Sequence, residues 1–310
     1  MKQILNLVAG ALLLVPGSAM AAETLVPVPP VAGSVVTTVF AINDNNVVAG
    51  SFVTPDGKEH GFSGTLDGSY TTFDSSLKNT QARGINNDGI VTGIGYDNKH
   101  ASIFERYPDG SIAYVTKNGR PLGFGVAGAI NGDGIFVADA FNRKATKHFN
   151  FFGQNGEYTK EIVTPGLSIA RPRGVNDSKD VAGYYQDDGG DLHGFLLKNG
   201  AVTTIDYPDA EGTIVYGVNN ADEMTGIWGD AKERPHAFVY DAASAQFKSI
   251  VEKDTENGKF AVAYGLNNEG LVAVNFVAAG GPFIYCPHKA SQCPSGAKAG
   301  VSPIKSAEHR

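Results

Sequence analysis

The stretch GVNDSKDVAGYYQDDGGDLHGFLLKNGAVTTID, residues 174–206, contains the pattern that decides the fold. It begins with a tetrad around Asn176, which leads into a turn. Three short runs rich in β-branched and aromatic residues follow, at 181–185, 193–195 and 202–206, and polar or glycine-containing loops separate them. Together with the run that leads into the tetrad, this pattern predicts four short antiparallel strands joined by tight turns.

The same pattern occurs six times along the chain. Its anchor asparagines are Asn43, Asn86, Asn131, Asn176, Asn219 and Asn267. The steps between them are 43, 45, 45, 43 and 48 residues. Four strands in a repeat of this length are typical of a β-propeller blade. We therefore predict an all-β, six-bladed β-propeller.

The sixth repeat indicates how the ring closes. It has counterparts of the first three strands, up to residues 282–285, but it lacks the final strand with paired threonines. Residues 24–28 (TLVPV) form a spare β-type run ahead of the first repeat, and Pro27 suits an outer strand. We expect this run to complete the last blade, which would hide the sheet edges of an open ring.

The composition agrees with a turn-rich β protein. Glycine accounts for 39 of the 310 residues, and charged residues make up only 18%. A hydrophobic content of 42% excludes an intrinsically disordered chain. The net charge is −7 without a concentrated positive stripe, which disfavours nucleic-acid binding.

The N-terminus has the order of a secretory signal peptide. Lys2 precedes an apolar run over 4–15, and small residues at 19–21 predict cleavage before Ala22. The run is too short to anchor the chain in a bilayer. We expect a secreted or periplasmic protein without a membrane span, with a signal peptide over 1–21, one propeller over 22–286 and a tail over 287–310.

Cys286 and Cys293 are the only cysteines. In an oxidising compartment we expect them to form a disulfide, which would hold the end of the closing blade. The alternative is a metal site, but that needs more ligands than this pair and nearby His288 supply. We predict no metal and no cofactor.

With its tetrad, its His-Gly-Phe run and its Thr-Thr run, the stretch 174–206 resembles the extracellular HAF-type repeat family of secreted bacterial proteins. The likeness covers nearly all of the mature chain, and it implies a propeller-like fold and export, without a uniform activity. Two repeats depart from the pattern. Residues 138–141 (ADAF) replace a Val-Ala-Gly-Tyr run, and Gly281 stands where histidine is expected. These departures mark places where function can have diverged.

The repeated histidines and asparagines are interpreted as structural. The histidines are His60, His100, His148, His193 and His236. One histidine in each of five repeats is spread around a ring, whereas a metal site or a general base needs groups that converge. We expect the imidazoles to bond within their blades and the asparagine side chains to cap the turns.

Functional residues are better sought where equivalent positions differ. The residue before each tetrad lies on the strand that lines the channel of a propeller, and these residues are Phe40, Arg83, Gly128, Arg173, Tyr216 and Tyr264. Two positions earlier stand Thr38, Gln81, Val126, Arg171, Ile214 and Val262. Guanidinium groups and phenol rings around one mouth suit a carboxylate, a sulfate or a sugar. Alternatively, these side chains only plug the channel or pair with loop acids.

The loops between the second and third strands are predicted to open on the same face. They carry Trp228 and the aspartates Asp56, Asp97, Asp187, Asp188, Asp191 and Asp230. The run 187–191 (DDGGD) lacks the ligand spacing and closing glutamate of a calcium loop. No nucleophile elbow, His-Glu-x-x-His pair or phosphate-binding loop occurs in the sequence.

Three functions of different classes fit these observations. The first is a binding propeller, expected to be a monomer, that recognises a glycan, an anionic small molecule or an envelope or extracellular protein. Its candidate ligand-binding residues are Phe40, Arg83, Arg171, Arg173, Tyr216, Tyr264 and Trp228. The second is a lyase or hydrolase acting on an acidic polysaccharide, and the third is a structural envelope component.

In the enzyme, an arginine would neutralise the substrate carboxylate while another side chain moves the proton. The candidates for that step are Tyr216, Tyr264, His193 and His236. An arginine–tyrosine–histidine group in one pocket would favour the enzyme. A plugged channel would favour a binding or interaction protein.

Overall fold

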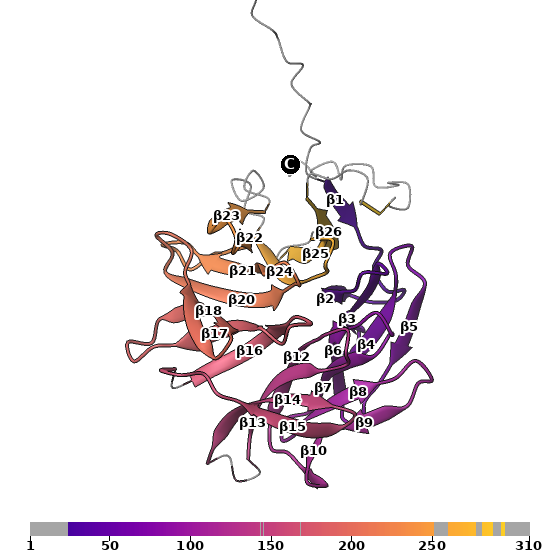
Figure 1. Cartoon of the computed structure of the whole chain (residues 1–310). Helices are drawn as coiled ribbons and strands as arrows, with labels where there is room; N and C mark the ends of the chain where they lie inside the picture. The colour runs from indigo at the N-terminus through magenta and orange to yellow at the C-terminus, as the bar shows by residue number, and fades with distance from the viewer. Residues whose placement is uncertain are drawn as a thin grey trace, which may run out of the picture.

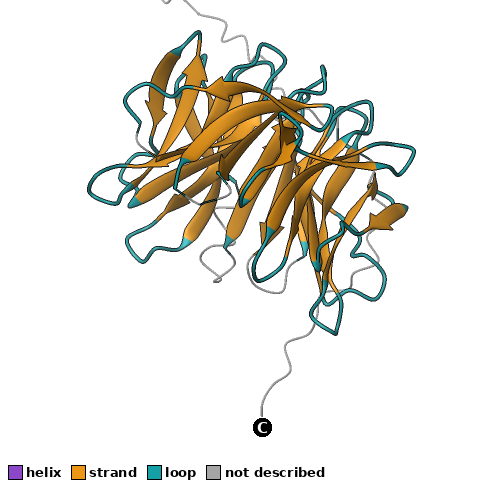
Figure 2. Ribbon diagram, turned by 90° about the horizontal axis from the view of Figure 1, so that it is seen from below, coloured by secondary structure: helices purple, strands orange, loops and turns teal. Residues whose placement is uncertain are grey.

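The computed structural model describes residues 24–142, 144, 146–167, 169–250, 260–276, 281–287 and 293–294. The predicted signal peptide and most of the predicted tail lie outside these residues. Within them all regular structure is β-strand (Figure 2), and no helix of theirs could cross a membrane. The strands form six sheets around a ring (Figure 1), which confirms the predicted six-bladed propeller.

Four sheets have the four antiparallel strands that the repeats predict, with the first strand innermost. Blade 1 contains β2 (Val36–Ile42), β3 (Val47–Val53), β4 (Glu59–Thr65) and β5 (Tyr70–Phe73). Blade 2 contains β6 (Asn79–Ile85), β7 (Val91–Tyr96), β8 (Ala101–Arg106) and β9 (Ile112–Tyr114). Blade 4 contains β16 (Ile169–Val175), β17 (Val181–Gln186), β18 (Leu192–Lys198) and β19 (Ala201–Ile205). Blade 5 contains β20 (Gly212–Val218), β21 (Glu223–Gly229), β22 (Pro235–Asp241) and β23 (Gln246–Ser249).

Blade 3 is larger than the sequence predicts. Its four repeat strands are β12 (Gly125–Ile130), β13 (Phe136–Phe141), β14 (His148–Gln154) and β15 (Glu157–Ile162). The connection from blade 2 adds a hairpin of β10 (Thr116–Lys117) and β11 (Arg120–Pro121), and β10 pairs with β15 in parallel. Both residues of the hairpin turn, Asn118 and Gly119, have positive φ, as a tight two-residue hairpin turn requires. The hairpin therefore extends the outer edge of blade 3 to six strands.

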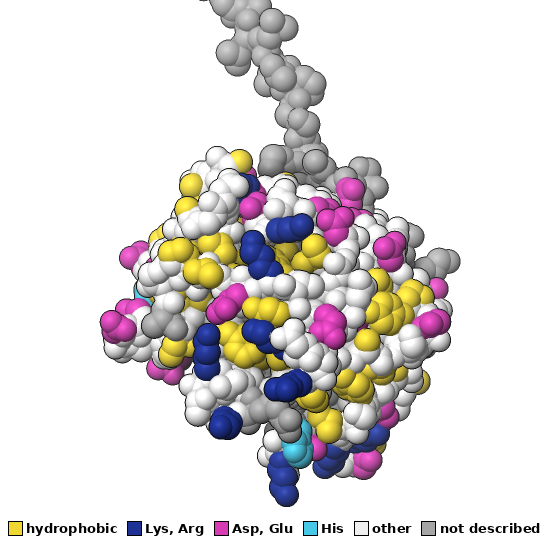
Figure 3. Space-filling view, turned by 60° about the horizontal axis from the view of Figure 1, so that its bottom comes forward, with side chains coloured by type: hydrophobic (Ala, Val, Ile, Leu, Met, Phe, Trp, Pro, Cys, Tyr) yellow, Lys and Arg dark blue, Asp and Glu magenta, His cyan; other side chains and the backbone are white. Residues whose placement is uncertain are grey.

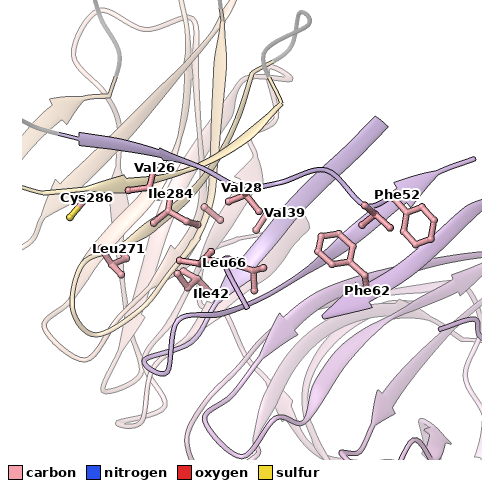
Figure 4. Close-up of a cluster of buried hydrophobic side chains, with 13 residues drawn as sticks. Val26, Val28, Val39, Ile42, Phe52, Phe62, Leu66, Leu271, Ile284 and Cys286 are labelled. Carbon is pink, nitrogen blue, oxygen red and sulfur yellow. The ribbon is translucent and has the colours of Figure 1, made fainter. Parts of the chain in front are cut away.

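Blade 6 is assembled from both ends of the chain, as predicted. It contains β24 (Ala261–Leu266), β25 (Val272–Phe276), β26 (Pro282–Cys286) and, outermost, β1 (Thr24–Pro27), with Thr24 opposite Cys286. Val26 and Val28 are buried in a cluster with Ile284 and residues of blade 1, which Figure 4 shows. The disulfide between Cys286 and Cys293 is present at the end of β26.

The recurring Gly and Phe of the repeats pack against each other inside blades 1, 2, 4 and 5. In blade 4 a Cβ atom on Gly183 would lie 2.9 Å from the ring of Phe195, which is fully buried. Gly50, Gly93 and Gly226 face Phe62, Phe104 and Phe238 in the same way. Blade 3 has Ala138 opposite Phe151, so the departure at 138–141 leaves this core intact.

Where a tetrad begins with glycine, the neighbouring blade leaves too little room for a Cβ atom. A Cβ atom on Gly84 would lie 3.0 Å from the carbonyl oxygen of Gly128, and one on Gly174 would lie 2.8 Å from the backbone nitrogen of Val218. These contacts are tighter than a Cβ atom normally tolerates, because the inner strands of adjacent blades meet closely here. We call the face with the tetrad turns the back face, and the face where the inner strands begin the front face.

The six anchor asparagines form a closed ring of hydrogen bonds at the back face. Each side-chain Nδ2 donates to the backbone carbonyl of the next anchor, at 2.9–3.3 Å, and Asn267 donates to Asn43 across the closing blade. Each Oδ1 accepts from the backbone N–H four residues later, at 2.9–3.0 Å, and so caps its turn as expected. All six residues are at most 5% exposed. The link between blades was not predicted.

The inter-blade half of this bond can be tested separately from the turn cap. Asn131→Asp keeps the acceptor for the turn but replaces the donor with an oxygen that faces a carbonyl. Since an unpaired buried polar group costs about 1–3 kcal/mol, we expect a clear loss of stability in denaturant unfolding. Asp133→Asn, at an exposed position of the same turn, is the control. An Asn131→Asp protein as stable as wild type would show that the ring contributes nothing.

The closing strand can be tested by deletion. A chain that lacks residues 24–28 loses the β1 pairing and the burial of two valines, each worth about 1.5–3 kcal/mol. We expect a markedly lower melting temperature than for a chain that begins at Thr24. Identical melting curves would contradict closure by both termini.

Candidate functional site

In every blade, a β-bulge turns one residue towards the axis of the ring. The register between the first two strands shifts at the residue before the tetrad, for example between Val39 and Ala41 and between Pro172 and Gly174. Bulges commonly re-aim a side chain in this way. The six bulged residues line one cavity and are Phe40, Arg83, Gly128, Arg173, Tyr216 and Tyr264. The structure therefore brings together the residues that the sequence analysis placed before the tetrads.

These side chains plug the channel. The ring centroid of Tyr264 lies 5.0 Å from that of Phe40 and 4.9 Å from that of Tyr216. The guanidinium of Arg83 lies 4.8 Å from the centroid of Phe40. The cavity they share with the aliphatic residues in front of the asparagine ring is about 80 Å³. That volume holds about two or three water molecules, so a sugar ring cannot enter it.

Among the described residues, no carboxylate is a direct hydrogen-bond partner of Arg83. Its Nε and one terminal nitrogen donate to Oε1 of Gln81, the residue two positions earlier. The amide of Gln81 donates in turn to Glu59, at 3.0 Å to each carboxylate oxygen. Ser51 and Tyr96 also donate to Glu59. Gln81 thus separates the guanidinium from the negative charge that balances it.

Asp139 gathers the other two arginines and a histidine. Arg173 donates to Oδ1 at 2.6 Å and Arg171 to Oδ2 at 3.1 Å, and Nε2 of His148 lies 3.3 Å from Oδ2. Asp139 is 2% exposed. Arg173 also lies over the ring of Tyr184. Sequence reasoning did not select Asp139 or Glu59, although the departure at 138–141 was a signal for the former.

The electrostatics of the plug favour a negative ligand group. Arg83 and Arg173 line the cavity, and their hydrogen-bond networks add Arg171, Asp139 and Glu59, so these groups carry three positive and two negative charges. Burial, and to a smaller extent the charge of Arg173, lowers the pKa of Arg83.

The phenols of the plug remain protonated near neutral pH. Burial raises the pKa of Tyr216 and of Tyr264. Both are half-buried, and the structure gives their hydroxyl groups no hydrogen-bond partner among the described residues. They can donate hydrogen bonds to a ligand, but they are poor bases.

The histidines bond within their own blades, as expected. Nδ1 of His60 lies 2.7 Å from Asp74 and Nδ1 of His193 lies 2.8 Å from Asp206, while Nε2 of His236 lies 3.1 Å from Asp230. Three imidazoles also stack on the aromatic residue opposite in the second strand. His193 and His236 therefore lie on third strands, apart from the channel tyrosines with which they were considered. Among the described residues no three His, Cys, Asp or Glu side chains are grouped to hold a metal ion.

The loop aspartates mostly cap turns. Oδ1 of Asp187 accepts from the N–H groups of Gly189 and Asp191, and Asp230 accepts in the same way from Lys232 and Arg234. Asp56 and Asp97 have the equivalent role.

Trp228 does not join the channel residues. Its indole stacks between Tyr207 and His236, at 4.4 and 4.3 Å between ring centroids. It lines a separate groove between blades 4 and 5. The structure therefore divides the predicted ligand-binding set between two places on the front side of the ring.

Figure 3 shows basic side chains through the middle of one face, with acidic ones between them and towards the rim. The overall charge of −7 is therefore not spread evenly. A local site can have the opposite sign to the whole protein.

No protein-family model matches this chain, and no curated protein matches it. TolB from Acinetobacter baumannii is similar in structure, with a TM-score of 0.54 and 12% identity, over 79% of this chain and 64% of that chain. A protein assigned as TolB from Agrobacterium tumefaciens has a TM-score of 0.52 and 12% identity, over 70% of this chain and 80% of that chain. A gluconolactonase from Xanthomonas campestris has a TM-score of 0.49 and 12% identity, over 86% and 98% of the two chains. At such identities the likeness shows the propeller fold alone.

The pairing of His193 predicts a pH effect. Burial alone would lower its pKa, but Asp206 and Asp187 outweigh burial and raise it above the ordinary value. A raised pKa in the folded state stabilises the fold below about pH 6.5, the unfolded value, and this contribution disappears as the pH rises through the folded value.

Asp206→Asn should therefore lower the pKa of His193 in an NMR titration. The stability difference from wild type should be largest at acidic pH. Exposed His100 serves as the internal reference. A His193 pKa unchanged by the substitution would contradict the assignment.

Proposed function

We propose that this chain is an exported binding propeller that recognises an anionic ligand at the front mouth of its channel. The observation that carries this proposal is that two arginines, Arg83 and Arg173, line the cavity, and that their hydrogen-bond networks together hold three guanidinium groups and two carboxylates, which leaves one positive charge for a ligand to balance. The disulfide supports the export part of the proposal, because such bonds persist in oxidising compartments.

The geometry limits how the ligand binds. The plug leaves no room for a sugar ring inside the channel, so the body of the ligand lies on the front face and only an anionic group reaches inward. Arg171 stands two positions before the plug, and its side chain is 34% exposed. Only one of its nitrogens is engaged by Asp139, which leaves donors for a carboxylate or sulfate. A polysaccharide with uronic acid or sulfate groups is the ligand class that fits.

Binding is better supported than catalysis on the same face. A lyase needs a base to remove a proton, and the raised pKa values of Tyr216 and Tyr264 make phenolate scarce near neutral pH. His148 is bonded to Asp139 beside the arginines, but the cavity lined by the plug, about 80 Å³, is too small to enclose a sugar ring for reaction. A plugged channel favours recognition at the surface.

The proposal is tested with a double substitution. Arg83→Gln with Arg171→Gln removes two positive charges and leaves the buried Arg173–Asp139 pair intact. We expect affinity for a uronic-acid oligosaccharide to fall by roughly tenfold or more, since hydrogen bonds to charged groups are worth about 1.5–3 kcal/mol each. Isothermal titration calorimetry measures the change, and melting curves verify the fold.

Lys160→Gln is the matched control, because Lys160 is an exposed cation on β15, the fourth repeat strand of blade 3. A neutral oligosaccharide of the same length shows whether charge matters. Equal binding by the double variant and wild type, or equal binding of the acidic and neutral oligosaccharides, would refute the proposal.

A further inference from the structure

A second groove lies on the front side between blades 4 and 5, away from the plug. It has a volume of about 390 Å³. Its walls come from the loop after β17, the start of β20, the end of β21 and the loop before β22. The lining residues are Gly190, Asp191, Leu192, Glu211, Gly212, Ile214, Ile227, Trp228, Gly229, Glu233 and Pro235. We call it the blade 4–5 groove.

The groove combines apolar walls with a one-sided charge. Leu192, Ile214, Ile227 and Trp228 are all partly exposed. Three carboxylates, Asp191, Glu211 and Glu233, stand around them, and none of the described residues that line the groove is basic. An apolar surface with acidic groups of a single sign is complementary to a cation carried on a hydrocarbon stem.

The groove carboxylates have no partner within the described residues, in contrast to several acidic side chains near them. Asp187 and Asp206 are paired with His193, and Asp230 is paired with Arg234. By contrast, the structure gives the side chains of the three groove carboxylates no ion pair and no hydrogen bond within the described residues. The groove carboxylates are therefore available to a positive group from outside the chain.

We propose that the blade 4–5 groove docks an extended, basic segment of a partner protein. Lysine or arginine stems lie along the apolar walls, and their charged heads meet the three carboxylates. The carboxylates come from two blades, so more than one positive charge along the segment is needed to match them. A groove of 390 Å³ also exceeds what a single ammonium group fills.

The indole of Trp228 does not bind the cation by its ring face. Tyr207 and His236 cover both faces, so the affinity comes from the carboxylates and the apolar walls.

Trp228 nevertheless offers a direct readout of binding in the groove. Trp228 is the only tryptophan of the chain, and its fluorescence therefore reports on the groove alone.

The test titrates the full mature chain with a capped hexapeptide of alternating glycine and lysine. A peptide with glutamine in place of lysine is the neutral counterpart. We expect the lysine peptide to change Trp228 emission saturably, and Glu211→Gln with Glu233→Gln to weaken its binding by roughly five- to tenfold. Higher salt should weaken it as well. Calorimetry of the same titration measures binding independently of fluorescence.

The matched control is Asp88→Asn with Asp133→Asn, two exposed acids in back-face turns, which should leave affinity unchanged. The proposal is overturned if no saturable binding occurs, if the groove double variant binds like wild type, or if the glutamine peptide binds equally. Calorimetric binding without a change in Trp228 emission would place the peptide elsewhere. Spermidine binding as tightly as the peptide would show a small-cation site instead of a protein-docking groove.

Discussion

The asparagine at the centre of each tetrad is the residue on which the ring depends, because its two amide atoms serve two levels of structure at once. The oxygen folds the hairpin of its own blade, and the nitrogen holds the next blade. Glutamine would be too long and aspartate would lack the donor, so the side chain that makes the turn also makes the ring. Because every blade repeats this pair of bonds and Asn267 returns to Asn43, no blade has an unsatisfied partner at the back face.

The width of the channel follows from this constraint. The hydrogen bonds hold the inner strands of adjacent blades so close together that each tetrad begins with glycine or alanine. Because the back face is fixed by these bonds, the residue type along the channel varies only just in front of it, at the bulged residue. There the six blades carry residues that differ in size and charge, whereas the interiors of four blades repeat the same Gly–Phe contact. The structure therefore separates what must repeat from what is free to differ.

Much of the fold could be predicted from the sequence, because its periodicity reflects contacts within one repeat. The anchors at Asn43 to Asn267 give the blade number, and the missing strand of the sixth repeat points to residues 24–28. The residue pairs of the site were harder to predict, because they join different blades. The repeat pattern within one blade does not indicate which residues of two blades will meet. The pairing of Arg173 with Asp139 links different repeats. The sequence also predicted Arg83, on a channel strand, and Trp228, on a loop, to lie on the same face of the ring. In the structure they line different cavities.

Blade 6, which is assembled from both ends of the chain, also determines when folding of the ring can be completed. β1 is the first described strand to be synthesised, yet its partner β26 lies more than 250 residues later. Such a long-range pairing comes at the end of folding, because the loop it closes contains the whole ring. Until β26 is available, β1 presents an open edge, and premature pairing with a second chain is the hazard of that interval. A nascent chain of this kind therefore cannot complete its last blade before β26 has been made.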